Sequence, residues 1–237
     1  MGPRIPAGRG WPWLLAVGLP ALLVRAFELG GPSLWIDEAF SAWVISHGMA
    51  EIWQVIPRFD THPPLYYALL EAWTWLLGDS EAALRSLSLV VSLATVPVIH
   101  AAGRALAPPG EGPWLARTAA AILALAPLQV AYAQEARSYA LLTFAAALAL
   151  LGALRLMRSP DAARVPWLGW GAAAGTTRAS WALLVGGWAL CLWTHNLGAL
   201  VVASFLPPLG LWWLMGRRDP ALAGNLALAV LLALLLW

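Results

Sequence analysis

The chain has 237 residues, of which 61% are hydrophobic and only 11% are charged, and its mean hydropathy is +0.71. A soluble domain averages about 25% charged residues, so this composition is typical of a polytopic membrane protein. The net charge is only +2, and the basic residues, all of them arginine, form no stripe, which argues against a nucleic-acid partner. The single cysteine, Cys191, excludes an internal disulfide and a cysteine-based metal site.

The apolar segments predict an all-α fold, a single domain over residues 1–237 built as a polytopic bundle of transmembrane helices. A spanning helix needs about 20 mostly apolar residues. Seven segments fit or approach this requirement: 11–29, 82–106, 114–133, 138–157, 179–195, 197–215 and 220–237. Since the last segment is still apolar at its end, we expect the chain either to stop in the membrane or to be the N-terminal part of a longer protein.

The distribution of arginine predicts the orientation. With the N-terminus in the cytoplasm, ten arginines lie at cytoplasmic ends of the spans and four lie outside, as the positive-inside rule expects. Nine of the twelve acidic residues then fall outside: Glu28, Asp37, Glu38, Glu51, Asp60, Glu71, Asp79, Glu81 and Glu135. We therefore expect a multi-pass plasma (inner) membrane protein whose active face is external or periplasmic.

The first external loop, residues 30–80, is the longest polar segment and contains two predicted helices. Residues 37–56 place Phe40 and Trp43 at helical spacing, and residues 64–77 follow a proline that suits a first helical turn. Both segments are rich in Trp and Tyr, which favour the membrane interface. We expect amphipathic interfacial helices that form a lid over whatever the loop binds.

The acidic pair Asp37-Glu38 stands at the start of the first loop helix. Acidic residues are favoured at a helix N-terminus by the helix dipole, and this alone explains the pair equally well. A carboxylate that is partly removed from water can also take a proton from a hydroxyl group as a general base. From the position alone, both interpretations of Asp37 stay open.

The segment AYAQEARSYALL (131–142) joins two predicted spans almost without a loop. It places Gln134, Glu135, Arg137 and Tyr139 at the external boundary. One interpretation is a turn whose Glu135 and Arg137 snorkel to water. The other is an anion clamp, because a guanidinium forks onto the oxygens of a lipid phosphate at this depth.

His195, in the segment WTHNLG, also falls at an external boundary, where a lone histidine is typical of the polar end of a helix. Asp60, His62 and His195 together offer ligands for a divalent cation. Their spacing matches no known metal signature. A divalent cation therefore stays open, and no cofactor is assigned.

Four motifs in order along the chain, LWIDEAFSAW, HPPLYYALLEAW, QEARSYALL and WTHNLGAL, resemble a known family. They are similar to the multi-spanning lipid-linked-sugar glycosyltransferases of the GT-C class. The nearest group is the bacterial members similar to protein O-mannosyltransferases and aminoarabinose transferases. The resemblance implies transfer of a sugar from a polyprenyl-phosphate donor to an acceptor protein, glycan or lipid at the external face.

Carried over by motif, the resemblance implies roles for individual residues. Asp37 is the expected catalytic base, with Glu38 beside it in the acidic pair, and Arg137 is expected near the donor phosphate. The other residues expected to bind substrate are Asp60, His62, Tyr66, Gln134, Glu135, Tyr139 and His195. Family members are typically longer, with more spans and often a further external domain, and Asn196 stands where relatives often have an aromatic residue.

Two functions of other classes remain as alternatives. A small transporter or lipid flippase would place the acidic residues along a substrate path. A non-catalytic assembly subunit would retain the N-terminal half of the family fold. The charges gather at one membrane face rather than at mid-bilayer, and the sequence shows no clear inverted repeat, which favours the enzyme.

Overall fold

The computed structural model describes residues 11–59, 62–108, 112–164 and 175–235. Every regular element in these ranges is a helix, which confirms the all-α prediction. The elements are α1 (Trp11–Ala26), α2 (Ile36–Ile45), α3 (Met49–Phe59), α4 (Leu65–Leu77), α5 (Glu81–Leu106), α6 (Gly112–Leu125), α7 (Pro127–Ala133), α8 (Tyr139–Arg158), the 3-10 helix η1 (Ala162–Arg164), α9 (Gly175–Thr194), α10 (Gly198–Trp212), the π-helix η2 (Trp213–Arg217) and α11 (Pro220–Leu235).

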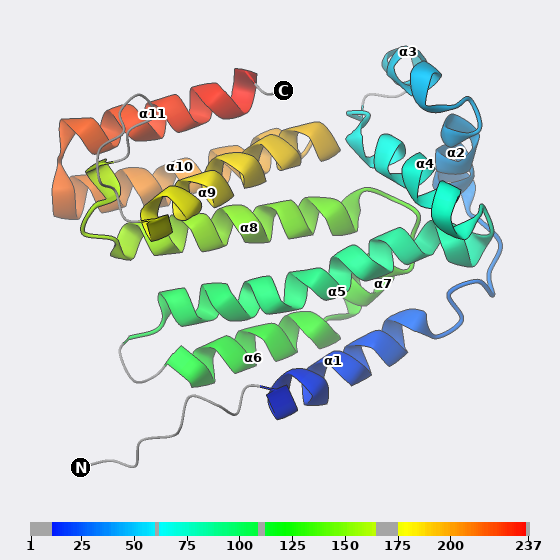
Figure 1. Cartoon of the computed structure of the whole chain (residues 1–237), viewed down its shortest axis with the longest axis horizontal. Coiled ribbons are helices and arrows are strands. Elements are labelled where there is room, and N and C mark those ends of the chain that lie inside the picture. The colour runs from blue at the N-terminus through cyan, green and yellow to red at the C-terminus, as the bar shows by residue number, and fades with distance from the viewer. Residues whose placement is uncertain (1–10, 60–61, 109–111, 165–174, 236–237) are drawn as a thin grey trace.

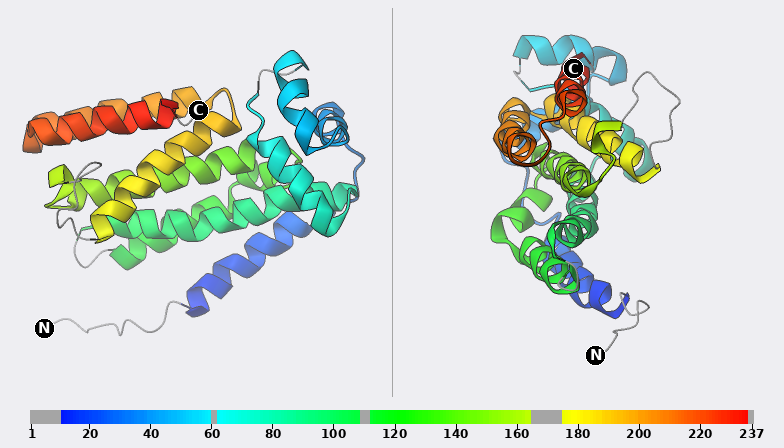
Figure 2. Two further views of the ribbon diagram at one scale, coloured as in Figure 1. Left: turned by 45° about the horizontal axis from the view of Figure 1, so that its top comes forward. Right: turned by 90° about the vertical axis from the view of Figure 1, so that its left-hand side faces the viewer.

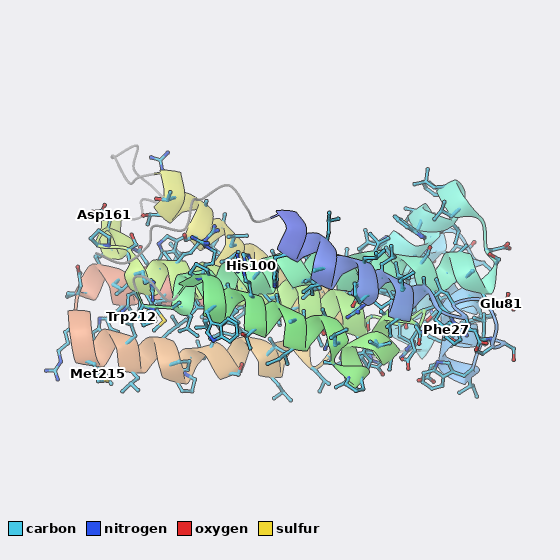
Figure 3. All side chains as sticks on the ribbon, turned by 90° about the horizontal axis from the view of Figure 1, so that it is seen from below. Phe27, Glu81, His100, Asp161, Trp212 and Met215 are labelled. Atoms are coloured by element: carbon cyan, nitrogen blue, oxygen red, sulfur yellow. The ribbon has the colours of Figure 1, made fainter. Side chains whose placement is uncertain are left out.

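The long helices lie side by side, with α5 and α8 in the centre (Figure 1). Helices α1 and α6 pack on the α5 side, and α9, α10 and α11 continue the layer beyond α8 (Figures 1 and 2). Helices α2, α3 and α4 gather at one end of the bundle, and we call them the cap. Phe27 and Glu81 mark this cap end in Figure 3, whereas Asp161 and Met215 mark the far end.

Helices α8 and α9 approach each other closely at two glycines. A Cβ atom on Gly152 of α8 would lie 2.5 Å from the backbone nitrogen of Leu184, and one on Gly187 of α9 would lie 2.6 Å from that of Ala149. Small residues let two helix backbones come together, and this contact is characteristic of helix pairs in membranes. The pairing fixes where α9 ends and therefore where His195 lies.

A sharp bend separates α6 from α7, whose axes differ by 57°. Pro127 begins α7, and because proline has no N–H, carbonyl groups of the preceding turn lose their helical donor. The fully buried Arg25 of α1 supplies another donor, from Nη1 to the Ala124 carbonyl oxygen at 2.6 Å. Its Nε donates to the Ser92 hydroxyl of α5 at 3.0 Å. One arginine thus ties α1, α5 and α6 together at the bend.

A helix occupies each of the seven segments predicted to span the membrane. Within the described residues, three helices are long and apolar enough to cross a bilayer: Glu81–Leu106, Tyr139–Arg158 and Gly198–Gly216. The bent pair of α6 and α7 brings the number to four if it forms one span. The apolar helices Leu15–Ala26 and Pro220–Leu235 are shorter.

The prediction of one continuous helix over 37–56 is wrong, because the chain breaks at Gly48 into α2 and α3. Gly48 has φ +86°, a left-handed conformation that glycine adopts without a Cβ clash. Helix α3 then begins at Met49, whose N–H donates to the Glu71 carboxylate of α4 at 2.7 Å. This hydrogen bond between the two helices satisfies an N–H group at the start of α3, which stabilises the break. The second predicted loop helix, 64–77, is confirmed as α4.

Candidate functional site

Three segments that are distant in the sequence meet at the cap end of the bundle. They are the start of α2, the first turns of α5, and the turn over residues 134–138 that joins α7 to α8. The turn lies where α5, α7 and α8 come together near the cap (Figure 1). The predicted site residues of the acidic pair and of the QEAR motif are therefore brought to one place.

Glu38 is fully buried, and donors surround its carboxylate. Oε1 accepts from Nε of Arg85 and from the backbone nitrogen of Ala136, both at 2.8 Å. Oε2 accepts from Nη2 of Arg85 at 2.6 Å and from the backbone nitrogen of Trp35 at 3.3 Å. Burial alone raises the pKa of the Glu38 carboxyl, but the hydrogen bonds from Arg85 and Ala136 outweigh it and hold the pKa below its usual value. Glu38 is thus an ionised residue that joins three segments.

Arg85 belongs to the same cluster, although no sequence motif includes it. Besides its two bonds to Glu38, its guanidinium donates to the carbonyl oxygens of Leu29, Pro32 and Ser33 at 3.0, 2.8 and 3.2 Å. It therefore also holds the segment that leads from α1 into the cap. An arginine near the start of an apolar helix needs a buried partner, and this expectation is the signal that points to it.

Asp37 and Arg137 form an ion pair in which the carboxylate is partly exposed to solvent. The Asp37 side chain is 42% exposed, and its Oδ2 lies 3.9 Å from Nη2 of Arg137. Nη1 of Arg137 donates to the backbone oxygen of Asp37 at 3.3 Å. Arg137 is only 6% exposed, and within the described part of the chain its Nε has no hydrogen-bond partner. The long ion pair leaves the Asp37 carboxylate accessible beside a buried cation.

Gln134 and Glu135 have different surroundings in the same turn. The Gln134 amide donates to three carbonyl oxygens at the end of α1, the shortest bond reaching Phe27 at 2.9 Å. This contact caps α1, and a role of Gln134 in binding substrate stays a prediction. Burial, followed by the neighbouring charge of Glu38, raises the pKa of the Glu135 carboxyl above its usual value. Glu135 therefore holds a proton more readily than an exposed glutamate.

Glu135 lines a cavity of about 420 Å³ that lies beside the Asp37–Arg137 pair rather than around it. The cavity is lined by Phe27, Glu28, Leu29, Pro32, Ser33, Trp35, Glu38, Arg85, Ala131, Gln134 and Glu135. It is therefore bounded by the α1–α2 connection and by the turn before α8. Its wall includes both members of the buried Glu38–Arg85 pair.

The buried side chain of Tyr66 in α4 connects the cap to the turn over residues 134–138. It is buried, and its hydroxyl lies 3.4 Å from that of Ser88, which in turn donates to the Arg137 carbonyl oxygen at 3.2 Å. Burial raises the pKa of the Tyr66 phenol well above its usual value. Tyr66 thus stays protonated and supports the backbone of Arg137.

A second group of predicted residues, His62, Tyr139 and His195, lies against the first. The Nε2 atoms of the two histidines are 3.3 Å apart, and the ring of Tyr139 packs on His195 with centroids 5.5 Å apart. The backbone N–H of Leu197 donates to Nδ1 of His195 at 3.0 Å. Nδ1 is therefore an acceptor, so the proton of the neutral ring lies on Nε2. In this tautomer Nε2 of His195 donates to Nε2 of His62.

Tyr139 joins the two groups, because its hydroxyl also interacts with Arg137. Asp60 lies outside the described residues. Among the residues that the structure describes, no three His, Cys, Asp or Glu side chains are placed to hold a metal ion. Of the predicted site, the structure therefore brings together the acidic pair, the QEAR turn and the two histidines.

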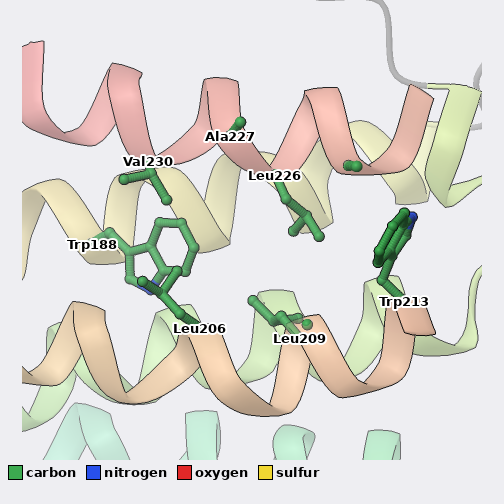
Figure 4. Close-up of a pocket in the computed structure, with 9 residues that line it drawn as sticks. Trp188, Leu206, Leu209, Trp213, Leu226, Ala227 and Val230 are labelled. Atoms are coloured by element: carbon green, nitrogen blue, oxygen red, sulfur yellow. The ribbon is translucent and has the colours of Figure 1, made fainter. Parts of the chain in front are cut away.

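An apolar cavity of about 240 Å³ lies elsewhere, between α9, α10 and α11 (Figure 4). Trp188, Leu206, Leu209 and Val230 are among its lining residues, and none of the described residues that line it is charged. It offers no acid, base or anion-binding group. The described residues of the predicted site gather instead at the cap end.

No protein-family model, no curated protein and no solved structure matches the chain.

Proposed function

We propose that the chain is a polytopic membrane glycosyltransferase of the GT-C type that uses a polyprenyl-phosphate-linked sugar. The observation that carries this proposal is the meeting of Asp37 and Arg137, one hundred positions apart in the sequence, at one end of an apolar helical bundle. Sugar transfer from a lipid phosphate needs a base for the acceptor hydroxyl and a cation for the departing phosphate. These two residues supply both groups side by side.

In the proposed reaction, the Asp37 carboxylate takes the proton of the acceptor hydroxyl. The acceptor oxygen forms a bond to the anomeric carbon while the bond from that carbon to the phosphate oxygen breaks. The electron pair leaves with the polyprenyl phosphate, whose negative charge is stabilised by the Arg137 guanidinium. Direct displacement inverts the anomeric centre. The ion pair in the resting protein opens as the phosphate replaces Asp37 as the partner of Arg137.

Glu38 and Arg85 act as positioning residues in this proposal. Glu38 follows Asp37 in the chain, and its carboxylate binds the N–H of Ala136, which precedes Arg137. The buried pair therefore sets the distance between the base and the cation. Because donors already occupy both Glu38 oxygens, Asp37 and not Glu38 is assigned as the base.

The membrane arrangement is part of the proposal. The cap end faces the outside and the far end faces the cytoplasm, since arginine is concentrated at the far ends of the helices. The Trp- and Tyr-containing cap lies at the outer interface, where such side chains are favoured. The acceptor then approaches from outside, and the lipid-linked donor approaches from the bilayer.

The proposal is tested by reconstituting the purified chain in liposomes with radiolabelled polyprenyl-phosphate hexoses. Transfer of label to a peptide, glycan or lipid acceptor, with release of free polyprenyl phosphate, supports the enzyme. Movement of intact donor across the bilayer without cleavage supports the flippase alternative instead. Donor binding with neither cleavage nor movement supports an assembly subunit.

A further inference from the structure

The far end of the bundle holds a second polar cavity, where α8 ends and α9 begins. Its volume is about 540 Å³, and its lining is Arg155, Arg158, Ser159, Pro160, Thr176, Thr177 and Ala179. The ends of α8 and α9 that form it lie at the opposite end of the bundle from the cap (Figure 1), on the side that Asp161 marks in Figure 3. The cavity is therefore separate from the Asp37–Arg137 pair.

Two guanidinium groups line the cavity, and neither has an acidic partner among the residues that the structure describes. Arg155 is exposed in the last turn of α8, and within the described residues it makes no hydrogen bond or ion pair. Arg158 donates from Nη2 to the carbonyl oxygens of Leu106 and Ala107, which caps α5. Because carbonyl groups carry no net charge, these hydrogen bonds do not neutralise the positive charge of Arg158. The cavity wall is thus positive.

The remaining polar groups of the cavity are also able to donate. Thr177 is only 3% exposed, and its hydroxyl lies 3.0 Å from that of Ser159. When Ser159 donates in this contact, the Thr177 hydrogen is available to an anion in the cavity. Thr176 and Thr177 lie in the first turn of the 20-residue helix α9, where backbone N–H groups lack helical acceptors. The cavity is therefore lined by guanidinium and hydroxyl groups, next to the N-terminus of α9.

Charge along the sequence favours the same kind of ligand. Between residues 140 and 218 the chain has six arginines and a single acidic residue, Asp161. Asp161 does not line the cavity. Among the described residues that line the cavity, none carries a carboxylate that competes with an incoming anion.

We propose that this cavity binds a phosphate group, presented either by an anionic lipid headgroup or by a soluble phosphate compound. A guanidinium forks onto two phosphate oxygens, and a helix N-terminus stabilises the remaining charge. This chemistry does not depend on the proposed reaction at the cap end. The site anchors the junction of α8 and α9, which also positions the close α8–α9 contact.

The test compares three variants with the parent chain: Arg155→Gln, Thr177→Val and, as a matched control, Arg104→Gln. Arg104 is an exposed arginine in the last turn of α5 and does not line the cavity. Each purified full chain is placed in nanodiscs of phosphatidylcholine, with and without phosphatidylglycerol. Phosphatidylcholine discs are also titrated with inorganic phosphate at constant ionic strength. Thermal unfolding is the readout.

A lipid source predicts that phosphatidylglycerol raises the Tm of the parent and of Arg104→Gln, but not of Arg155→Gln or Thr177→Val. A soluble source predicts saturable stabilisation by phosphate, with an apparent affinity about tenfold weaker in Arg155→Gln. Two results overturn the proposal. One is an equal response of the parent and all three variants, which indicates general electrostatics. The other is a parent that responds to neither ligand.

Discussion

At the residue scale, Asp37 and Glu38 are neighbours in sequence with different surroundings. Successive side chains on a helix point about 100° apart, so one member of the pair enters the protein while the other faces its surface. Glu38 meets Arg85 and Ala136 inside, and Asp37 remains 42% exposed next to Arg137. Glu38 therefore holds the site together, whereas Asp37 offers an accessible carboxylate. The proposed function depends on Asp37.

Arg137 gives the first prediction. Arg137→Ala is expected to fold but to bind the polyprenyl-phosphate donor at least about tenfold more weakly, because a charge-assisted hydrogen bond is lost. Arg137→Lys should recover little of this affinity, since lysine keeps the charge but loses the fork. Donor binding measured by titration of the reconstituted protein checks both. Parent-like affinity in a folded Ala variant would leave Arg137 with a structural role only.

Glu38 gives a prediction about stability and pH. Its folded pKa is lowered, so the ionised form contributes stability that is present above the unfolded pKa, about 4.3, and is lost as the pH falls through the folded value. Glu38→Gln removes this acid dependence and leaves Arg85 buried without its charge partner, at a cost of about 3–5 kcal/mol. Thermal unfolding between pH 3 and pH 7 measures both effects. Glu51→Gln, at an exposed position on α3, is the control, and an equal loss in the two variants would contradict the account.

At the element scale, the bundle depends on the glycine contact between α8 and α9. Gly187→Ala places a methyl group 2.6 Å from the backbone nitrogen of Ala149, so the two helices must separate. We expect a loss of about 1–3 kcal/mol, typical of overpacking. Gly186→Ala is the matched control, because nothing lies within 4 Å of a Cβ at that position. Unfolding in detergent compares the two variants, and equal stability would show that the helices adjust without cost.

The positions of the helices were largely predictable, whereas their breaks and tertiary anchors were not. Apolar runs about 20 residues long identify the long helices because the pattern is local. The break at Gly48 depends on Glu71 of α4, which lies 22 residues after Met49 and accepts a hydrogen bond from the start of α3. Periodicity over 37–56 carries no information about that contact.

The same limit applies to the site. The acidic pair and the QEAR turn were identified from their polar character within apolar sequence, and the structure brings them together. Arg85 was not singled out, because its role comes from carbonyl groups and a carboxylate more than 45 residues away. Gln134 was expected to bind substrate, but only the folded chain shows that its amide caps α1.

At the scale of the whole molecule, the account requires the cap to lie outside the membrane and the far end to lie in the cytoplasm. Single cysteines at Ala50 in the cap and at Met215 at the far end, both exposed, test this arrangement in a Cys191→Ser background. An impermeant thiol reagent added outside intact cells should label Ala50→Cys and not Met215→Cys. The reverse labelling would overturn the orientation and, with it, the approach of the acceptor from outside.

The central claim is that Asp37 takes the acceptor proton. Its most direct test is the rate of sugar transfer from a polyprenyl-phosphate hexose by equal amounts of folded parent, Asp37→Asn and Asp79→Asn in liposomes. Asp79 is exposed between α4 and α5 and serves as the control. Asparagine keeps the shape of aspartate but cannot accept the proton, so Asp37→Asn should still bind donor but transfer sugar about 10²-fold more slowly or worse. Transfer at the parental rate by Asp37→Asn would contradict the account.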